Sequence, residues 1–311
     1  MASAPAGVKR RDDAIRPRTR PRELQDGLNH YLYHPLAARL ARLLLPTRVS
    51  PNAVSVGSAV ALVGASLAYT LLPWPSGVAI GFALMLAWHV IDGADGDLAR
   101  LRGTASPTGE IVDGFCDYFG NVFMYFAFAF LLDNSIGGWA WLLAVAAGAS
   151  HVVQTNHAET QRRLYLWRVY GVPWVRTAAA SGDAAFQKKS WVSRYFSFWA
   201  VGYVWLSRKM TPDDAVDAAL ADAAGDPRRL RRIRLKIRRA SRGSLLLEKA
   251  LGSNPKTIII GLSMALGSPL WFFLAQIFVL DLILIWSISH HKRVARRLAR
   301  ALGAGAAASD G

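Results

Sequence analysis

Four aspartates stand at regular spacing within two otherwise largely apolar stretches of the chain. Asp92 and Asp95 are three residues apart, and Asp113 and Asp117 are four residues apart. On a helix, either spacing places both side chains of a pair on one face. Clustered carboxylates near a membrane repel one another unless a cation neutralises them, and oxygen ligands favour Mg²⁺, Mn²⁺ or Ca²⁺. The spacing therefore predicts a divalent metal site.

The residues around the aspartates suit a nucleotide-diphosphate substrate. Gly96 leaves room for close backbone approach, and Arg100, one turn further on, can pair with phosphate through two hydrogen bonds. Gly109 allows the helix with the second pair to begin tightly against the first helix. The link 103–108 is short, so we expect two antiparallel neighbouring helices with all four carboxylates facing one cavity.

The segment from Asp92 to Asp117 resembles the signature of the CDP-alcohol phosphotransferase family, D(x2)DG(x2)AR(x8)G(x3)D(x3)D. Every fixed position of that signature is present: Asp92, Asp95, Gly96, Ala99, Arg100, Gly109, Asp113 and Asp117. The resemblance implies a metal-dependent transfer of a phospho-alcohol from a CDP-alcohol to an acceptor hydroxyl, with release of CMP. It also makes a homodimer an expected assembly.

The resemblance further implies a role for each matching residue. The first three aspartates, Asp92, Asp95 and Asp113, are the expected metal ligands, and the third bridges to a second site, so we expect two ions of Mg²⁺ or Mn²⁺. Asp117 is expected both to be a metal residue and to act as the base that deprotonates the acceptor. The expected contacts to the CDP moiety come from Asn52, Gly96 and Arg100.

The composition combines 52% hydrophobic residues with a net charge of +16 over 311 residues. The two properties are segregated, because Lys and Arg are absent from 52–99 and 103–161 and crowd the N-terminus, 161–256 and the C-terminus. This pattern indicates a membrane protein whose partners include lipids. No GxxxxGK segment or zinc-ligand spacing is present, so a nucleic-acid partner is not expected. The lone cysteine, Cys116, excludes an internal disulfide.

The apolar stretches predict an all-α polytopic fold with six transmembrane helices. A span needs roughly 20 mostly apolar helical residues. The run 255–289 is too long for one span, and Gly267 to Pro269 break it into an expected hairpin of two short spans. Ahead of the first span, 28–45 has the periodicity of an amphipathic helix lying on the membrane. The four earlier spans are expected at about 53–72, 77–99, 109–132 and 138–157.

These elements divide the chain into five expected segments. Within the insert, an acidic helix is expected over 212–224, and Pro227 opens a basic helix interpreted as an electrostatic anchor. The apolar stretch 191–206 is interpreted as interfacial rather than spanning. The segments are a basic N-terminus without regular structure (1–27), the interfacial helix with four spans (28–157), the cytoplasmic insert (158–253), the last two spans (254–290) and a basic tail (291–311).

The distribution of basic residues predicts the orientation in the membrane. The three turns expected outside carry no Lys or Arg, so both termini and the aspartates are expected in the cytoplasm. The Ala- and Arg-rich composition suggests a multi-pass plasma membrane protein of the bacterial inner membrane. Asp281 lies deep in the last span, where an ionisable residue is a functional candidate by default or pairs with a neighbouring helix, and we do not assign it to the site. Packing or interfacial roles are expected for His151, His157 and Glu159.

Two polarities of transfer are compatible with the signature. The favoured donor is CDP-diacylglycerol, with a small alcohol as acceptor, in phospholipid biosynthesis. The alternative is a CDP-linked polar alcohol that donates its phospho-headgroup to a lipid hydroxyl, such as that of diacylglycerol or a ceramide-like base. In another class, an aspartate-lined cation transporter accounts for the carboxylates but not for Gly96, Ala99 and Arg100.

Overall fold

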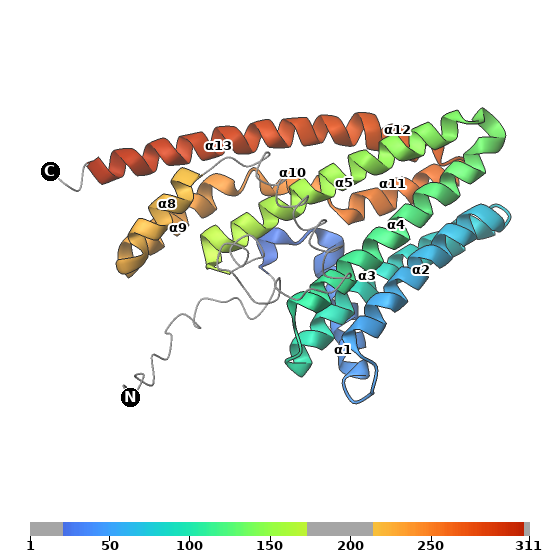
Figure 1. Ribbon diagram of the computed structural model, residues 1–311, viewed down its shortest axis with the longest axis horizontal. Coiled ribbons are helices and arrows are strands. Elements are labelled where there is room, and N and C mark those ends of the chain that lie inside the picture. The colour runs from blue at the N-terminus through green and yellow to red at the C-terminus, as the bar shows by residue number, and fades with distance from the viewer. Residues whose placement is uncertain (1–20, 173–213, 308–311) are drawn as a thin grey trace, which may run out of the picture.

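The computed structural model describes residues 21–172 and 214–307, and this part of the chain is helical with no strand (Figure 1). The expected interfacial segment 191–206 lies outside the described residues. The N-terminal part contains η2 (Arg22–Leu24), η3 (Asn29–Tyr33), α1 (His34–Leu44), α2 (Pro51–Leu71), α3 (Ser76–Arg102), α4 (Pro107–Ile136), α5 (Trp139–Tyr165) and η4 (Leu166–Tyr170). The C-terminal part contains α8 (Asp214–Asp222), η6 (Ala223–Gly225), α9 (Pro227–Ser241), α10 (Leu245–Ala250), α11 (Ser253–Ala265), α12 (Leu270–Leu274), η7 (Ala275–Leu280) and α13 (Asp281–Ala307).

The segment expected as an amphipathic helix near the N-terminus is helical, with η3 followed directly by α1. Its small residues Ala37 and Ala41 are fully buried and pack with Ala94 and Leu98 of α3. The large side chain of Leu43 on the same helix is 72% exposed. The helix thus packs on the bundle through alanines and keeps an outward apolar surface, as the interfacial interpretation requires.

Four of the six expected spans are helices long and apolar enough to cross a membrane. They are α2, α3, residues 112–136 of α4, and the continuous helix 270–302. The expected fourth span forms a helix, α5, but does not meet these criteria. The fifth, α11, has 13 residues, about 20 Å of helix, which is shorter than the roughly 30 Å of a bilayer core. A membrane-spanning role for α5 and α11 stays a prediction.

The break in the last apolar run is confirmed, and the helix after it is longer than expected. Gly267 adopts φ 82° after α11, and α12 begins directly after Pro269. From there α12, η7 and α13 form one helix through Ala307, which includes most of the stretch expected as a tail. Beyond its apolar part, α13 buries Ala295 and Leu298. Packing within the protein therefore stabilises a helix in this basic segment, which the composition of the segment alone does not predict.

The acidic and basic helices of the insert are present as α8 and α9. Asp226 caps α9 by accepting hydrogen bonds from the amides of Arg228 and Arg229 at 2.8 and 3.1 Å. α9 also buries Ile233 and Ile237 in a cluster with residues of α8 and α13. Figure 1 shows α8 and α9 against the C-terminal half of α13. The basic helix is therefore a packed element of the structure, with its charges on the remaining faces.

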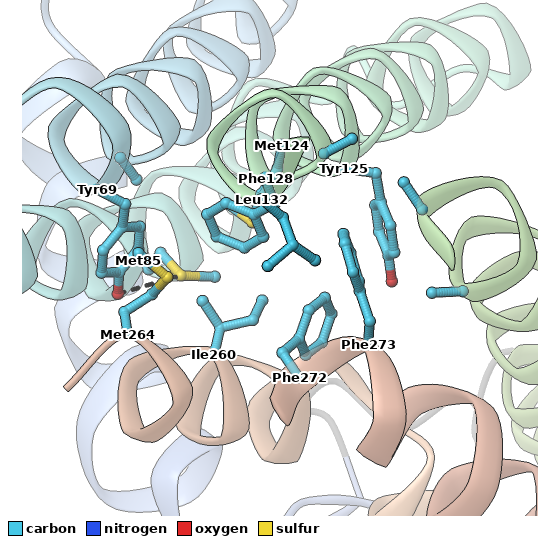
Figure 2. Close-up of a cluster of buried hydrophobic side chains, with 14 of the residues drawn as sticks. Tyr69, Met85, Met124, Tyr125, Phe128, Leu132, Ile260, Met264, Phe272 and Phe273 are labelled. Carbon is cyan, nitrogen blue, oxygen red and sulfur yellow. Dashed lines mark hydrogen bonds between the residues drawn. The ribbon is translucent and has the colours of Figure 1, made fainter. Parts of the chain in front are cut away.

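A core of aromatic and sulfur-containing side chains holds the bundle together (Figure 2). Phe128 of α4 contacts the rings of Phe272 and Phe273, with ring centroids 6.2 and 6.4 Å apart. Tyr69 of α2 lies beside the same Phe128 at 6.0 Å and donates a hydrogen bond to Met85 Sδ of α3 at 3.8 Å. Because this core joins α2, α3, α4 and α12, it fixes how these helices approach one another.

α2 lies between the two helices that carry the aspartates. It packs closely against both α3 and α4, whereas among the described residues α3 and α4 make few contacts with each other. Glycine allows the close approach at two points. A Cβ at Gly81 of α3 would lie 2.7 Å from the Tyr69 ring, and one at Gly120 of α4 would lie 2.8 Å from Leu62. α2 therefore acts as the spacer that sets the separation of α3 and α4.

We predict that Gly81→Ala destabilises the bundle, because the new methyl group overlaps the buried Tyr69 ring. Overpacking of this kind costs about 1–3 kcal/mol, so the thermal unfolding temperature in detergent falls. The matched control is Gly64→Ala in the same interface, where the Cβ would lie at an ordinary 3.6 Å from Leu84. If the two variants unfold at the same temperature, the close packing of α2 on α3 is wrong.

Candidate metal centre

The aspartates lie where α3 ends and α4 begins. Gly103 ends α3 in the left-handed conformation with φ 66°, which only glycine adopts without strain. Ser106 then caps α4, its hydroxyl accepting a hydrogen bond from the Gly109 amide at 3.1 Å. This short turn reverses the chain, so the end of α3 and the start of α4 face the same region.

Three of the four aspartates form one group. Asp92, Asp95 and Asp113 each offer an oxygen atom, and these oxygens all lie within 4.8 Å of one another. Asp95 is only 6% exposed, and Asp92 Oδ1 is buried and accepts no hydrogen bond from the described residues. A buried carboxylate oxygen without a donor is costly unless a cation occupies its lone pairs. An all-oxygen set of this kind fits a hard divalent cation such as Mg²⁺ or Mn²⁺.

Asp95 is held by groups from two helices. The hydroxyl of Ser55 on α2 donates to Oδ2 at 2.5 Å, and the amide of Gly96 donates to Oδ1. Ser55 is itself 2% exposed. These hydrogen bonds fix the carboxylate orientation, as outer-shell groups do around metal ligands. Sequence reasoning missed Ser55, because α2 also carries Ser58 and Ser66 and nothing in the sequence distinguishes Ser55 from them.

Asp117 lies beside Asp92 but outside the group of three. The indole Nε1 of Trp88 donates a hydrogen bond to Asp117 Oδ1 at 3.2 Å. Trp88 is 6% exposed and lies against the ring of His89, with centroids 4.3 Å apart. His89 in turn bonds to Thr257 Oγ1 of α11 at 2.8 Å. A packed chain of side chains therefore orients Asp117, and neither Trp88 nor His89 was singled out from the sequence.

The three residues expected to contact the CDP moiety lie near this group, and their surroundings differ. Arg100 forms an ion pair with Asp97 and keeps 55% of its side chain exposed. Gly96 lies directly beneath it, because a Cβ there would be 3.3 Å from Arg100 Nη1. Asn52 lies in the first turn of α2, and a Cβ at Gly109 would be 3.8 Å from its side-chain oxygen. The structure thus brings Asn52 to the start of α4 and Gly96 and Arg100 to the end of α3.

A clamp that the sequence did not reveal holds the turn before α2. Arg102, at the end of α3, donates from Nη1 to the carbonyl oxygen of Val49 at 2.5 Å. Its Nη2 reaches the carbonyl oxygens of Leu44 and Thr47 at 2.9 and 2.8 Å. Every residue type carries a backbone carbonyl, so the sequence does not indicate which carbonyls Arg102 binds. The clamp ties the turn between α1 and α2 to the helix that carries the first aspartate pair.

Polar residues outside this group have structural partners. Asp281 accepts hydrogen bonds from Ser150 and Gln154 of α5, both at 2.7 Å, which confirms that it pairs with a neighbouring helix. His151 bonds to the Tyr125 hydroxyl at 3.2 Å, and His157 bonds to Ser287 at 2.9 Å. Glu159 forms ion pairs with Arg162 and Arg163 at 2.7 and 2.5 Å. The packing interpretation of these residues fits this arrangement.

Comparison with known families identifies the segment that contains the site. The family model for CDP-alcohol phosphatidyltransferase matches residues 48–182, which include all four aspartates and Asn52, Gly96 and Arg100. The resemblance seen in the signature is thereby confirmed. The chain matches no curated protein in a sequence comparison.

We predict that Asp92→Asn removes most of the stabilisation that a divalent metal gives. Mn²⁺ or Mg²⁺ raises the unfolding temperature of the wild type, because binding to the folded state alone stabilises it. Asp97→Asn is the matched control, since Asp97 lies on the same helix but outside the group of three. Without metal, Asp92→Asn unfolds no earlier than the wild type, because it removes a repelling charge. Equal metal responses in the two variants would contradict the site.

Proposed function

We propose that this chain, whose residues 48–182 carry a CDP-alcohol phosphatidyltransferase domain, transfers a phosphatidyl group from CDP-diacylglycerol to a small alcohol and releases CMP. Members of the family transfer phosphorus-containing groups in phospholipid synthesis. The observation that carries the proposal is the gathering of Asp92, Asp95 and Asp113 within 4.8 Å beside Asp117. This is an arrangement that can hold a cation against a diphosphate.

The metal would be held by Asp92, Asp95 and Asp113. We propose two ions, of Mg²⁺ or Mn²⁺. The fit rests on the all-oxygen donor set and on the buried, unpartnered Oδ1 of Asp92. A bound divalent cation offsets negative charge on the diphosphate and on the departing CMP. Ser55 and the Gly96 amide hold Asp95 in position. A cation bound here would also relieve the repulsion among the three carboxylates.

Asp117 would take the proton from the acceptor hydroxyl, whose oxygen then attacks the β-phosphorus. The hydrogen bond from Trp88 fixes the orientation of this carboxylate. A base must be held within hydrogen-bonding reach of the proton it removes, and a rigid donor reduces the reorganisation this requires. Its place beside Asp92, yet outside the group of three, fits a base that works next to the bound diphosphate.

Arg100, Gly96 and Asn52 would bind the CDP moiety. The ion pair between Arg100 and Asp97 is half exposed, and exposed pairs contribute little free energy, about 0–1 kcal/mol. Arg100 can therefore exchange Asp97 for a diphosphate at low cost. Gly96 beneath it leaves room for the phosphates to approach the backbone of α3.

We place the site and both termini in the cytoplasm of a bacterial inner membrane, as the positive-inside rule favours. α3 ends and α4 begins at the aspartates, and α5 runs back toward the same end before α9 packs on η4. The exposed basic residues of α13, Arg293, Arg296 and Arg297, follow its apolar part. All of these charges then lie on the side of the membrane that carries the metal centre. A homodimer stays part of the proposal.

Release of CMP tests the reaction, and the lipid product identifies its polarity. Purified protein with Mg²⁺ or Mn²⁺ is expected to release CMP from CDP-diacylglycerol when a small alcohol is supplied. Lipid mass spectrometry after expression in a host that lacks the candidate products then identifies the new lipid. Release only from a CDP-linked polar alcohol with diacylglycerol would reverse the assigned polarity. No release across a panel of donors and acceptors would contradict the transferase assignment.

We predict that Asp117→Asn abolishes turnover but retains CDP-alcohol binding, because it removes the base without removing the group of three.

Trp88→Phe keeps the aromatic packing and removes only the indole N–H. A hydrogen bond to a charged group is worth about 1.5–3 kcal/mol, so kcat falls roughly tenfold or more while KM stays near the wild-type value. Nucleotide binding is measured by calorimetry and turnover by CMP release. Loss of binding in Asp117→Asn would make this residue chiefly a metal ligand.

A further inference from the structure

A polar cavity lies among α5, α9, α10 and α13, apart from the aspartates. Its volume is about 50 Å³, and since a water molecule needs roughly 10–15 Å³ by such a measure, it has room for about four waters or one phosphate group. Its side chains come from the end of α5, from α9 and α10 with the turn between them, and from α13. The polar residues that line it include Gln161, Arg168, Ser244, Glu248, His291 and Lys292.

Two buried side-chain atoms in this cavity lack hydrogen-bond partners. Gln161 is 6% exposed and Ser244 is 1% exposed. Gln161 Nε2 and Ser244 Oγ are both buried and find no partner among the described residues. Native proteins rarely leave buried polar atoms unsatisfied. The Gln161 amide nitrogen is a donor only, so the missing partner must offer hydrogen-bond acceptors.

The buried acid in the cavity is already neutralised. His291 Nδ1 lies 2.8 Å from the carbonyl oxygen of Ser287, which can only accept, so Nδ1 carries a proton. His291 Nε2 lies 3.1 Å from Glu248 Oε1, and this contact requires one more proton, on either the imidazole or the carboxyl. Either way the pair has no net charge. Burial raises the pKa of Glu248 although the hydrogen bond from His291 opposes this.

The remaining charges favour an anion. Arg168 is paired with Asp217 at 2.8 Å, so together they contribute no net charge. Lys292 is partly exposed at the cavity and takes part in no ion pair within the described parts of the chain. The lining thus combines a net positive charge with two buried groups, Gln161 and Ser244, that can donate hydrogen bonds. A tetrahedral oxyanion supplies the acceptors that these groups lack.

This cavity lies on a different face of α5 from the catalytic helices. Gly148 and His151 of α5 face Tyr125 of α4. Gln154 and His157 instead contact residues of the helix 270–307. Gln161 is seven residues after Gln154 and four after His157, so it continues their face of α5. The cavity is therefore separated from the aspartates by α5 itself.

We propose that this cavity is a binding site for a phosphate group, carried either by a small cytoplasmic solute or by a lipid headgroup. Gln161 and Ser244 donate to the phosphate oxygens, and Lys292 supplies the opposite charge. The proposal does not depend on the transferase reaction, because none of these residues belongs to the candidate metal centre. A site of this kind would let the insert sense a phosphorylated compound on a face of α5 remote from α4.

The test measures phosphate binding by the full-length protein in detergent with EDTA present. Inorganic phosphate is expected to bind saturably by calorimetry and to raise the unfolding temperature, relative to chloride at equal ionic strength. Gln161→Leu keeps the side-chain size and removes the donor, so we expect at least tenfold weaker binding. Ser244→Ala is a second variant with a smaller structural change. Asp92→Asn is the control and is expected to bind phosphate as the wild type does.

Each outcome bears on the proposal. If neither inorganic phosphate nor phosphatidic acid added in detergent binds saturably, the proposal fails. It also fails if both Gln161→Leu and Ser244→Ala bind as tightly as the wild type, or if Asp92→Asn abolishes binding. Competition by phosphatidic acid at lower concentration than phosphate would assign the site to a lipid headgroup. Retained phosphate binding in a variant without CMP release separates this proposal from the transferase function.

Discussion

The mutual repulsion of buried carboxylates is the constraint on which the rest of this structure depends. Asp92, Asp95 and Asp113 present oxygens within 4.8 Å of one another on helices of membrane-spanning length. Like charges at this distance in an apolar setting are unfavourable unless a cation or protons neutralise them. The fold has to hold them together in spite of this repulsion. The hydrogen bonds from Ser55 and from the Gly96 amide hold Asp95 locally, and the packing of α2 against α3 and α4 holds the helices that carry the group.

The means of holding the carboxylates lie at both ends of the bundle. Toward the α4–α5 turn, the aromatic core around Phe128 locks α2, α3, α4 and α12. At the aspartate end, Arg102 clamps the turn before α2, and Gly103 and Ser106 reverse the chain. α2 lies between, held close by Gly81 and Gly120. Because the core and the turns are rigid, the separation of α3 and α4 does not have to be maintained by the repelling groups themselves.

The sequence predicted those parts of this arrangement that depend on local residue spacing and composition. The aspartate spacing, the break at Gly267 and the start of α9 at Pro227 are local signals, and the structure contains all three features. The continuation of α13 was missed because Leu298 gains its partners from α8 and α9, far away in the chain. Ser55 and Trp88 were missed for the same reason, since their partners lie 40 and 29 residues away.

The insert is joined to the bundle by specific contacts rather than by charge alone. Glu23 accepts hydrogen bonds from Tyr165 and Tyr170 at 3.0 and 2.6 Å and pairs with Arg238 of α9 at 3.1 Å. Burial would raise the pKa of Glu23, but these partners together lower it, so the carboxylate stays charged in this contact. The segment before α1, the end of α5 and the basic helix thus meet at one residue. α5 also packs on α4, so one helix joins this contact to the helix that carries Asp113 and Asp117.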